Sequence, residues 1–113
     1  MRELQAPDFL VIGHMTKDIV PGGYRVGGTA TYAACTAQRL GWRAGILTRA
    51  EATLPLPEAL AGVTIHRLPS DCTTTYENRY LNGIRQQFVR AVAPPITPNA
   101  GLRRRRFCRG PAR

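Results

Sequence analysis

The sequence lacks the features that mark membrane, secreted and metal-stapled proteins. Its 113 residues include only three cysteines, Cys35, Cys72 and Cys108, which are widely spaced and form no CxxC pair. Such a set indicates neither a zinc site nor a disulfide framework. No apolar run approaches the roughly 20 residues needed to cross a bilayer, and the N-terminus does not have the layout of a signal peptide. These absences predict a cytoplasmic protein with no membrane partner.

Motifs for phosphate binding, metal binding and nucleophilic catalysis are missing as well. The sequence contains no GxxxxGK(S/T) loop and no complete GxGxxG. His14 and His66 are isolated, and neither has a second ligand at the spacing of a metal site, so a structural role is expected for both. No grouping of Ser, His and Asp indicates hydrolysis. The motifs therefore predict no catalytic, cofactor-binding or metal-binding residue.

Acidic residues are absent after Glu77, and this absence accounts for much of the high net charge. The chain has 16 Lys and Arg against 7 Asp and Glu, a formal net charge of +9. Six of the arginines lie in residues 102–113, so the rest of the chain has 10 basic and 7 acidic residues, or +3. The basicity thus belongs to the C-terminal segment and not to the body of the protein.

The C-terminal segment, residues 98–113, lacks apolar periodicity and is predicted to be a disordered arginine-rich tail. Its run Arg103–Arg106 could contact nucleic-acid phosphates, which makes a small basic nucleic-acid-binding protein the alternative hypothesis. No aromatic platform or recognition helix accompanies these arginines. We therefore favour a solvated tail with no nucleic-acid partner.

The body of the chain alternates between strands and one helix. The apolar run Asp8–Gly13 predicts a buried strand. The segment Thr29–Leu40 is rich in Ala, begins with Thr and is followed by Gly41, which together predict a helix. Trp42–Leu47 predicts the next strand and completes a βαβ-like unit, and the alternating segment Val63–Leu68 predicts a third strand.

A turn signal, Pro21-Gly22-Gly23, separates the segments Thr16–Val20 and Tyr24–Val26. This arrangement predicts a small hairpin that follows the first strand. Further along, two prolines leave room for only a short helix over Pro57–Ala61.

A second hairpin is predicted by Asn82-Gly83, which favours a tight turn between strands. The β-rich segments on either side are residues 73–80 and 84–92. Tyr76, Tyr80 and Phe88 fall on alternating positions, so we expect them to share one apolar face of this hairpin.

Two features converge where a ligand would bind in an open α/β sheet, beyond the carboxyl ends of strands and near helix N-termini. Asp18 follows the first strand after five residues, and Gly27-Gly28 precede the helix, where backbone can approach a ligand closely. A carboxylate beside free N–H groups suits a polyhydroxylated ligand. Spacing alone fits a solvated aspartate and a glycine turn equally well.

Several blocks of the sequence, in order, resemble the start of the ribokinase-like (PfkB-type) carbohydrate kinases. The blocks are Ile12-Gly-His-Met-Thr-Lys-Asp18, Gly27-Gly-Thr-Ala-Thr-Tyr-Ala-Ala34, Arg39-Leu-Gly41, Gly45-Ile-Leu-Thr48 and Thr73-Thr-Thr-Tyr-Glu-Asn-Arg-Tyr80 with Gly83-Ile-Arg-Gln-Gln87. The resemblance implies an incomplete ribokinase-like (Rossmann-like) α/β sheet with helices. It assigns residues 1–97 to the N-terminal part of the kinase domain, with the strands of a β-hairpin lid over about residues 73–92.

The family transfers phosphate from ATP, with Mg²⁺, to a hydroxyl of a sugar, nucleoside or related polyol. The resemblance implies that Asp18 accepts hydrogen bonds from substrate hydroxyls with Thr16 beside it, and that Gly27 and Gly28 present backbone N–H groups to the same ligand. Many members have Lys and Asn after the glycine pair, where this chain has Thr29 and Tyr32. The resemblance therefore leaves the substrate open.

The late Asp-Thr-x-Gly-Ala-Gly-Asp-type motif of the family, which supplies its catalytic base and anion hole, has no counterpart in this sequence. We therefore expect an N-terminal piece of such a kinase, inactive alone and binding neither ATP nor Mg²⁺ well, ended near Thr97 by a frameshift or a mispredicted reading frame. We also expect an unpaired sheet edge and an uncovered apolar face. These would favour aggregation or a homodimer formed through the lid strands.

Overall fold

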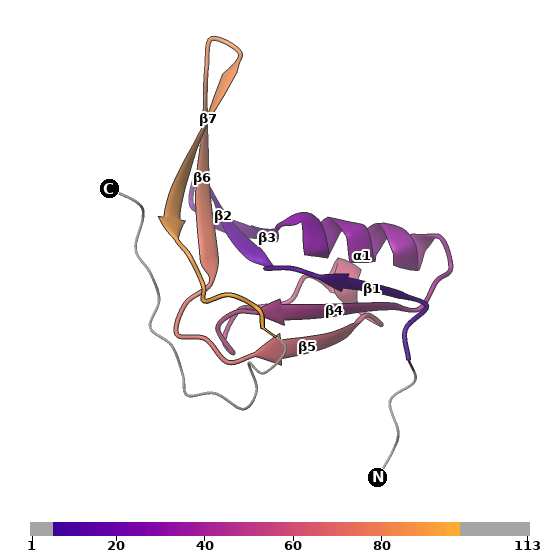
Figure 1. Ribbon diagram of the computed structural model, residues 1–113. Coiled ribbons are helices and arrows are strands. Elements are labelled where there is room, and N and C mark those ends of the chain that lie inside the picture. Colours follow the sequence, from indigo (N-terminus) through magenta and orange to yellow (C-terminus); the bar gives the residue numbers. More distant parts are fainter. Residues whose placement is uncertain (1–5, 98–113) are drawn as a thin grey trace.

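The computed structural model describes residues 6–97, which form two β-sheets, one α-helix and one short 3₁₀ helix (Figure 1). The predicted arginine-rich tail lies outside the described residues. No helix within the described part of the chain is long and apolar enough to cross a membrane.

The first sheet is parallel and carries the predicted βαβ unit. Its strands are β1 (Phe9–Ile12), β4 (Ala44–Arg49) and β5 (Thr64–Leu68), in the spatial order β1-β4-β5. Helix α1 (Thr29–Arg39) precedes β4 in the chain, packs on β1 and β4, and covers one face of the sheet (Figure 1). The short helix η1 (Glu58–Leu60) stands where the sequence predicted one.

Small side chains on α1 allow the helix to pack closely on the sheet. Ala30, Ala34 and Ala37 are buried against a core that includes Met15 and Ile46. Alanine adds no bulk and favours the helix, so the backbone of α1 can approach the strands. The close packing fixes the position of the helix N-terminus relative to the end of β1.

Helix α1 ends at a Schellman motif, which explains why β4 begins later than the sequence predicted. Gly41 has a φ of +90°, the N–H of Gly41 donates to the carbonyl of Gln38, and the N–H of Trp42 donates to the carbonyl of Ala37. Trp42 therefore belongs to the helix terminus. The predicted strand from residue 42 was wrong at this end, and the strand starts at Ala44.

The second sheet contains both predicted hairpins. Its strands are β2 (Thr16–Val20), β3 (Gly23–Gly27), β6 (Thr74–Leu81) and β7 (Ile84–Ala91), in the order β3-β2-β6-β7. Strands β2 and β6 are parallel, and the two hairpin pairs are antiparallel. The sheet joins the N-terminal hairpin directly to the later one.

The hairpin of β6 and β7, residues 74–91, is called the lid below. It stands away from the first sheet and from α1 (Figure 1). Its turn residues Asn82 and Gly83 have φ values of +51° and +77°. Positive φ at both central positions is what a two-residue hairpin turn of the primed type requires, which is why Asn-Gly predicted this turn correctly.

Phe88 does not share a face with the tyrosines of the lid, so this expectation was wrong. Phe88 pairs across the hairpin with Glu77, whereas Tyr76 pairs with Val89 and Tyr80 with Arg85. Paired residues point to the same side of a sheet and neighbouring residues point to opposite sides. Alternation does not simply continue across the turn: the two-residue turn pairs Leu81 with Ile84, so even-numbered residues of β6 share a face with odd-numbered residues of β7.

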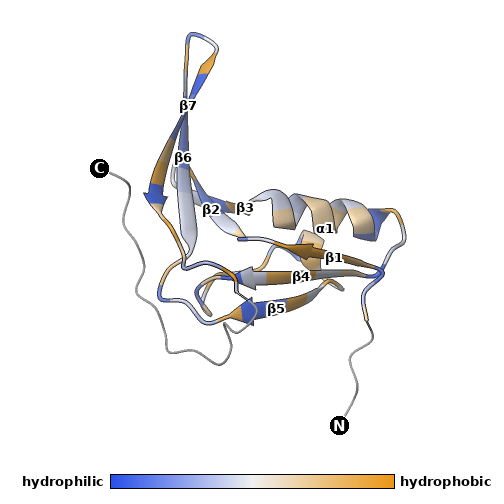
Figure 2. Cartoon of the chain, in the orientation of Figure 1, coloured by the Kyte–Doolittle hydropathy of each residue, from blue (hydrophilic) through white to orange (hydrophobic). Residues whose placement is uncertain are grey.

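One face of the first sheet is covered by α1, and the other is open within the described residues. Leu10 and Ile12 of β1 are 54% and 60% exposed, and they alternate with Phe9 and Val11, which pack toward the core. Strand β1, which is strongly hydrophobic (Figure 2), is also an edge of the sheet as described. The expected unpaired edge and uncovered apolar face are therefore both present in residues 6–97.

A Leu10→Thr variant should associate with itself less than the unmodified chain. Threonine keeps the β-propensity of the position but removes apolar surface from the open face of the sheet. We expect the concentration at which association begins, measured by sedimentation, to rise severalfold. Val11→Thr is the matched control, because Val11 packs toward the core and its change should lower stability by about 1 kcal/mol or more. Equal association of the Leu10→Thr and unmodified chains would contradict the prediction.

Candidate functional site

A cavity of about 560 Å³ opens between the end of β1, the first turn of α1 and the inner face of the lid. Thr16 and Asp18 of β2 line it on one side, and Asn78, Arg85 and Gln87 of the lid line it on another. This cavity is called the polar pocket below. A larger groove of about 680 Å³ runs along α1 and shares Thr29 and Tyr32 with the polar pocket. Its walls are chiefly apolar, so it offers little for hydrogen bonding.

The carboxylate of Asp18 is held in place by its neighbour on the same face of β2. Thr16 Oγ1 donates a hydrogen bond of 2.8 Å to Asp18 Oδ1, as the spacing of two residues along a strand allows. The Thr16 side chain is buried and Asp18 lies at the pocket. The second carboxylate oxygen, Oδ2, remains without a hydrogen-bond donor among the described residues.

Gly27 provides the space into which this carboxylate fits. It lies opposite Thr16 in the β2–β3 pairing, and a Cβ atom built on it would overlap Asp18 Oδ2 and lie 3.3 Å from the Tyr32 hydroxyl. Only glycine leaves room for the carboxylate in this position. The backbone at residue 27 thus approaches the same volume as the Asp18 side chain.

Gly28 turns the chain from β3 into α1 in a conformation that other residues rarely adopt. Its φ and ψ are 93° and 156°, a region essentially restricted to glycine. A Cβ atom there would lie 2.7 Å from the carbonyl oxygen of His14. The close approach joins the helix N-terminus to the end of β1.

The first turn of α1 presents backbone N–H groups to the polar pocket. Gly28, and not Thr29, occupies the N-cap position, and no side chain caps the helix. Thr31 Oγ1 donates to the carbonyl of Gly27, so this hydroxyl does not cap an N–H group of the helix. Gly28, Thr29 and Ala30 line the pocket, where uncapped N–H groups and the helix dipole attract oxygen-rich ligands.

All four predicted site residues come together in this structure. Thr16, Asp18, Gly27 and Gly28 meet where β2, β3 and the start of α1 join. Their role in substrate binding stays a prediction. The turn at residues 21–23 brings Gly27 back beside Thr16, with which it pairs. Sequence spacing therefore indicated that these residues lie close together.

The lid residues of the pocket were missed by sequence reasoning. Tyr76 of β6 lies beside Asp18 in the parallel β2–β6 pairing, and Asn78 follows on the same face, opposite Gln87. Arg85 lies opposite Tyr80 and also lines the pocket. The period of two and the Asn-Gly turn would place these residues on one face of the lid. Only the packing of the lid against β2 shows that this face looks into the pocket.

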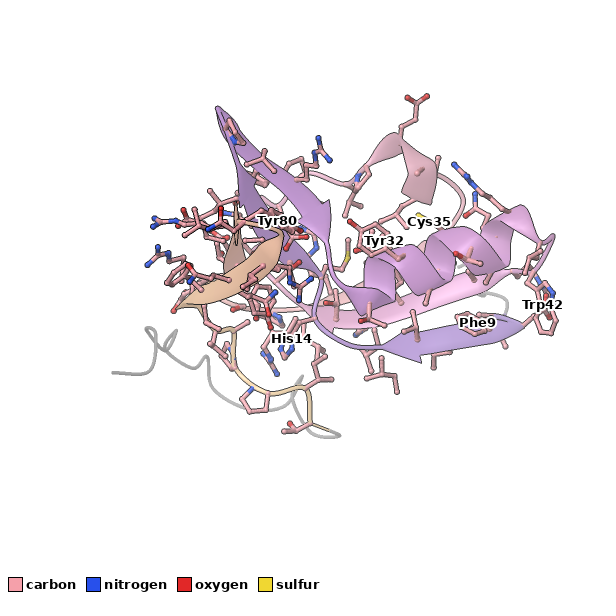
Figure 3. All side chains as sticks on the ribbon, turned by 90° about the horizontal axis from the view of Figure 1, so that it is seen from above. Phe9, His14, Tyr32, Cys35, Trp42 and Tyr80 are labelled. Atoms are coloured by element: carbon pink, nitrogen blue, oxygen red, sulfur yellow. The ribbon has the colours of Figure 1, made fainter. Side chains whose placement is uncertain are left out.

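His14 anchors the edge of the pocket. It follows β1 and lies beside the segment that leaves the lid (Figure 3), and its Nε2–H donates a hydrogen bond of 2.9 Å to the carbonyl of Pro94. The N–H of the next residue, Met15, donates to Thr48 Oγ1 at 2.8 Å. These contacts support the structural role expected for His14.

The outer face of the lid is held by a charged cluster. Glu77 accepts hydrogen bonds from Arg79 Nε at 2.9 Å and from Arg90 Nη2 at 2.7 Å. Both guanidinium groups also lie 5.0 Å from the ring centroid of Phe88. The hydrogen bonds from Arg79, and then Arg90, lower the pKa of Glu77 below its usual value of 4.5.

Because of the Glu77 cluster, the local stability of the lid should depend on pH. The folded state lowers the pKa of Glu77. The contribution of ionised Glu77 to the stability of the lid is therefore fully present above about pH 4.5 and is lost as the pH falls through the folded-state pKa. We expect the protection of the lid amides against hydrogen exchange, corrected for the pH dependence of the intrinsic exchange rate, to decrease below that pH. Glu77→Gln should remove this pH step, and Glu58→Gln on η1 should leave it unchanged. A step that persists in Glu77→Gln would contradict the assignment.

The polar pocket contains few potential ligands for a metal ion. Within residues 6–97 no three His, Cys, Asp or Glu side chains are grouped as ligands of a metal ion. Asp18 is the one carboxylate that lines the polar pocket.

Comparisons with known proteins give matches in solved structures alone. No protein-family model and no curated protein matches the chain. A sulfate complex of a pyrophosphate-dependent kinase in the ribokinase family matches with a TM-score of 0.63 and 26% identity, over 81% of this chain and 36% of the other. The fold is ribokinase-like.

Two further structures agree with this fold. A pyrophosphate-dependent kinase in the ribokinase family, complexed with a pyrophosphate analog and myo-inositol, matches with a TM-score of 0.61 and 28% identity, over 81% of this chain and 35% of that one. A protein from Agrobacterium tumefaciens assigned as a ribokinase matches with a TM-score of 0.52 and 18% identity, over 72% of this chain and 35% of the other. The chain spans about a third of the length of these proteins.

The ribokinase-like resemblance and the expected fold class are thereby confirmed. The described residues form the part of the fold that contains the βαβ unit, the N-terminal hairpin and the lid. A specific relation to the PfkB-type kinases stays a prediction, as does a cytoplasmic location.

Proposed function

We propose that this chain forms the acceptor-binding part of a ribokinase-like carbohydrate kinase and binds a sugar or polyol in the polar pocket. The observation that carries the proposal is the Asp18 carboxylate, which lines the polar pocket, is oriented by Thr16 and has one oxygen without a donor among the described residues. A ribokinase-family kinase of known structure that is 28% identical to the chain was solved with myo-inositol. Its ligand belongs to the class of compounds that the pocket would accept.

Each of the four site residues has a role in this proposal. Asp18 accepts hydrogen bonds from two neighbouring hydroxyls of the acceptor, since a carboxylate has about four lone-pair positions. Thr16 fixes the carboxylate, and Gly27 leaves the space for it. Gly28 places the uncapped N–H groups of α1 at the opposite side of the same ligand.

The phosphate donor is a separate matter. The resemblance to the PfkB-type kinases implies ATP as the phosphate donor, with Mg²⁺. The two ribokinase-family neighbours solved with sulfate and with a pyrophosphate analog are instead pyrophosphate-dependent. The sequence has no counterpart of the family's late motif that supplies the base. We therefore propose acceptor binding, and not phosphoryl transfer, as the activity of this chain alone.

Binding can be tested by ligand-observed NMR with a panel of polyols and monosaccharides that includes myo-inositol. We expect saturation transfer to at least one neutral polyol, which competes with the others for one site. A chain that shows the circular dichroism of a folded α/β protein and transfers saturation to no compound of the panel would overturn the proposal. Incubation with ATP or pyrophosphate and the bound polyol should yield no phosphorylated product.

Association of two copies through the lid also remains proposed. Strand β7 is an edge of the second sheet as described, and an edge strand can pair with a copy of itself. Nucleic-acid binding through Arg103–Arg106 depends on residues outside the described range, and no contact in residues 6–97 favours it.

A further inference from the structure

Arg85 is the arginine of the lid that has no partner within the described residues. The other two lid arginines, Arg79 and Arg90, both bind Glu77 on the outer face. Arg85 instead lies on the inner face, opposite Tyr80, and lines the polar pocket. No hydrogen bond or ion pair to it is found in residues 6–97, so its guanidinium is available to a ligand.

The charges of the pocket are therefore one carboxylate and one guanidinium that do not neutralise each other. Asp18 is hydrogen-bonded to Thr16 and not to Arg85. These two residues are the charged side chains among those that line the cavity. Asp18 comes from β2, and Arg85 comes from the far strand of the lid. Both groups line the same cavity.

The lid adds an unsatisfied hydrogen-bond acceptor on the same face. Asn78 Oδ1 is buried and has no hydrogen-bond partner among the described residues. Asn78 pairs across the hairpin with Gln87, which also lines the pocket. A buried acceptor without a donor is costly, and a ligand hydroxyl could satisfy it once the Asn78 side chain turns toward the pocket that it lines. Asp18 and Asn78 both suit hydroxyls, whereas Arg85 is an exposed cation on the wall of the same pocket and suits an anion.

We propose that the acceptor is a sugar or polyol that carries an anionic group, a phosphate or a carboxylate, bound by Arg85. This inference rests on the proposed function and names the substrate class of the same pocket. Arginine is suited to this role because its planar fork donates two parallel hydrogen bonds to either anion. The hydroxyls lie at Asp18 and Asn78, and the anionic end lies toward the lid.

The test compares neutral and anionic ligands of matched shape by isothermal titration calorimetry. The pairs are myo-inositol with myo-inositol monophosphate, and glucitol with gluconate. For the unmodified chain we expect at least one anionic ligand to bind roughly tenfold more tightly than its neutral counterpart, the gain typical of a charge-assisted hydrogen bond. The phosphate and carboxylate pairs show which anion is preferred, and either preference supports the proposal.

Two variants of the lid separate the role of Arg85 from general charge. Arg85→Gln should abolish the preference for the anion, so that the two members of each pair bind with equal affinity. Arg79→Gln removes the same charge from the outer face and should keep the preference. Inorganic phosphate alone should bind more weakly than the polyol phosphate, since it makes no contact with Asp18.

Three outcomes would count against the inference. Equal affinities for neutral and anionic ligands in the unmodified chain would overturn it but leave the proposed function standing. A preference that survives Arg85→Gln would overturn the assignment of the anion to Arg85. Absence of binding by every ligand, in a chain that is folded, would remove the proposed function and the inference together.

Discussion

Asp18→Asn should weaken the binding of a polyol by about 10- to 100-fold and leave the fold intact. Asparagine keeps the shape of the side chain but loses the charge, and hydrogen bonds to a charged group contribute roughly 1.5–3 kcal/mol, with tenfold in affinity for each 1.4 kcal/mol. The residue lies at the pocket with one oxygen unused. Calorimetry or competition NMR would measure the change, and circular dichroism would check the fold.

Asp8→Asn is the matched control for this substitution. Asp8 is also a carboxylate with a neighbouring partner, Arg43, at 3.4 Å, but it lies before β1 and not at the polar pocket. Its change should leave binding as it is in the unmodified chain. Equal affinity of Asp18→Asn and the unmodified chain would show that the carboxylate does not hold the ligand.

Gly28→Ala should both destabilise the protein and abolish ligand binding. Alanine would be forced into a backbone region that is essentially restricted to glycine, at a cost of about 1–3 kcal/mol. Its Cβ would also meet the carbonyl oxygen of His14. Since that oxygen belongs to the backbone, the helix N-terminus must move away from β1. For a chain of this size we expect the thermal midpoint to fall by roughly 8 °C or more.

Two other glycine variants make the result interpretable. Gly23→Ala is the neutral control, because no atom lies within 4 Å of its Cβ position and its φ is ordinary. Gly27→Ala displaces the end of the Asp18 side chain rather than backbone, so it should impair binding more than stability. It therefore keeps the test informative where Gly28→Ala fails to fold. A Gly28→Ala chain with unchanged stability and binding would refute the role assigned to the turn.

Local chemistry explains why most elements were predictable. Asn82-Gly83 specifies a tight turn through its positive φ values, and the alanines of α1 with Gly41 specify a helix and its end. The candidate site was accessible in the same way, since Thr16 and Gly27 lie on two strands joined by one short turn. Contacts between neighbouring segments follow from residue spacing.

The inner residues of the lid were not predictable, because they reach the site through a pairing between distant segments. Strand β6 lies beside β2 in parallel although nearly 60 residues separate them in sequence. This pairing brings Asn78 and Arg85 into the polar pocket and leaves Phe88 on the outer face with Glu77. A shift of one residue in the register would exchange the two faces.

Residue patterns were enough to predict the strands, the helix, the two turns and the proximity of Asp18 to Gly27 and Gly28. It also showed that the high charge belongs to the C-terminal segment. Tertiary structure alone decided which face of the lid meets the ligand, and that Arg85 has no partner among residues 6–97 while Arg79 and Arg90 share Glu77. Propensity and spacing act over a few residues, whereas sheet pairing and packing join segments that are far apart in the chain.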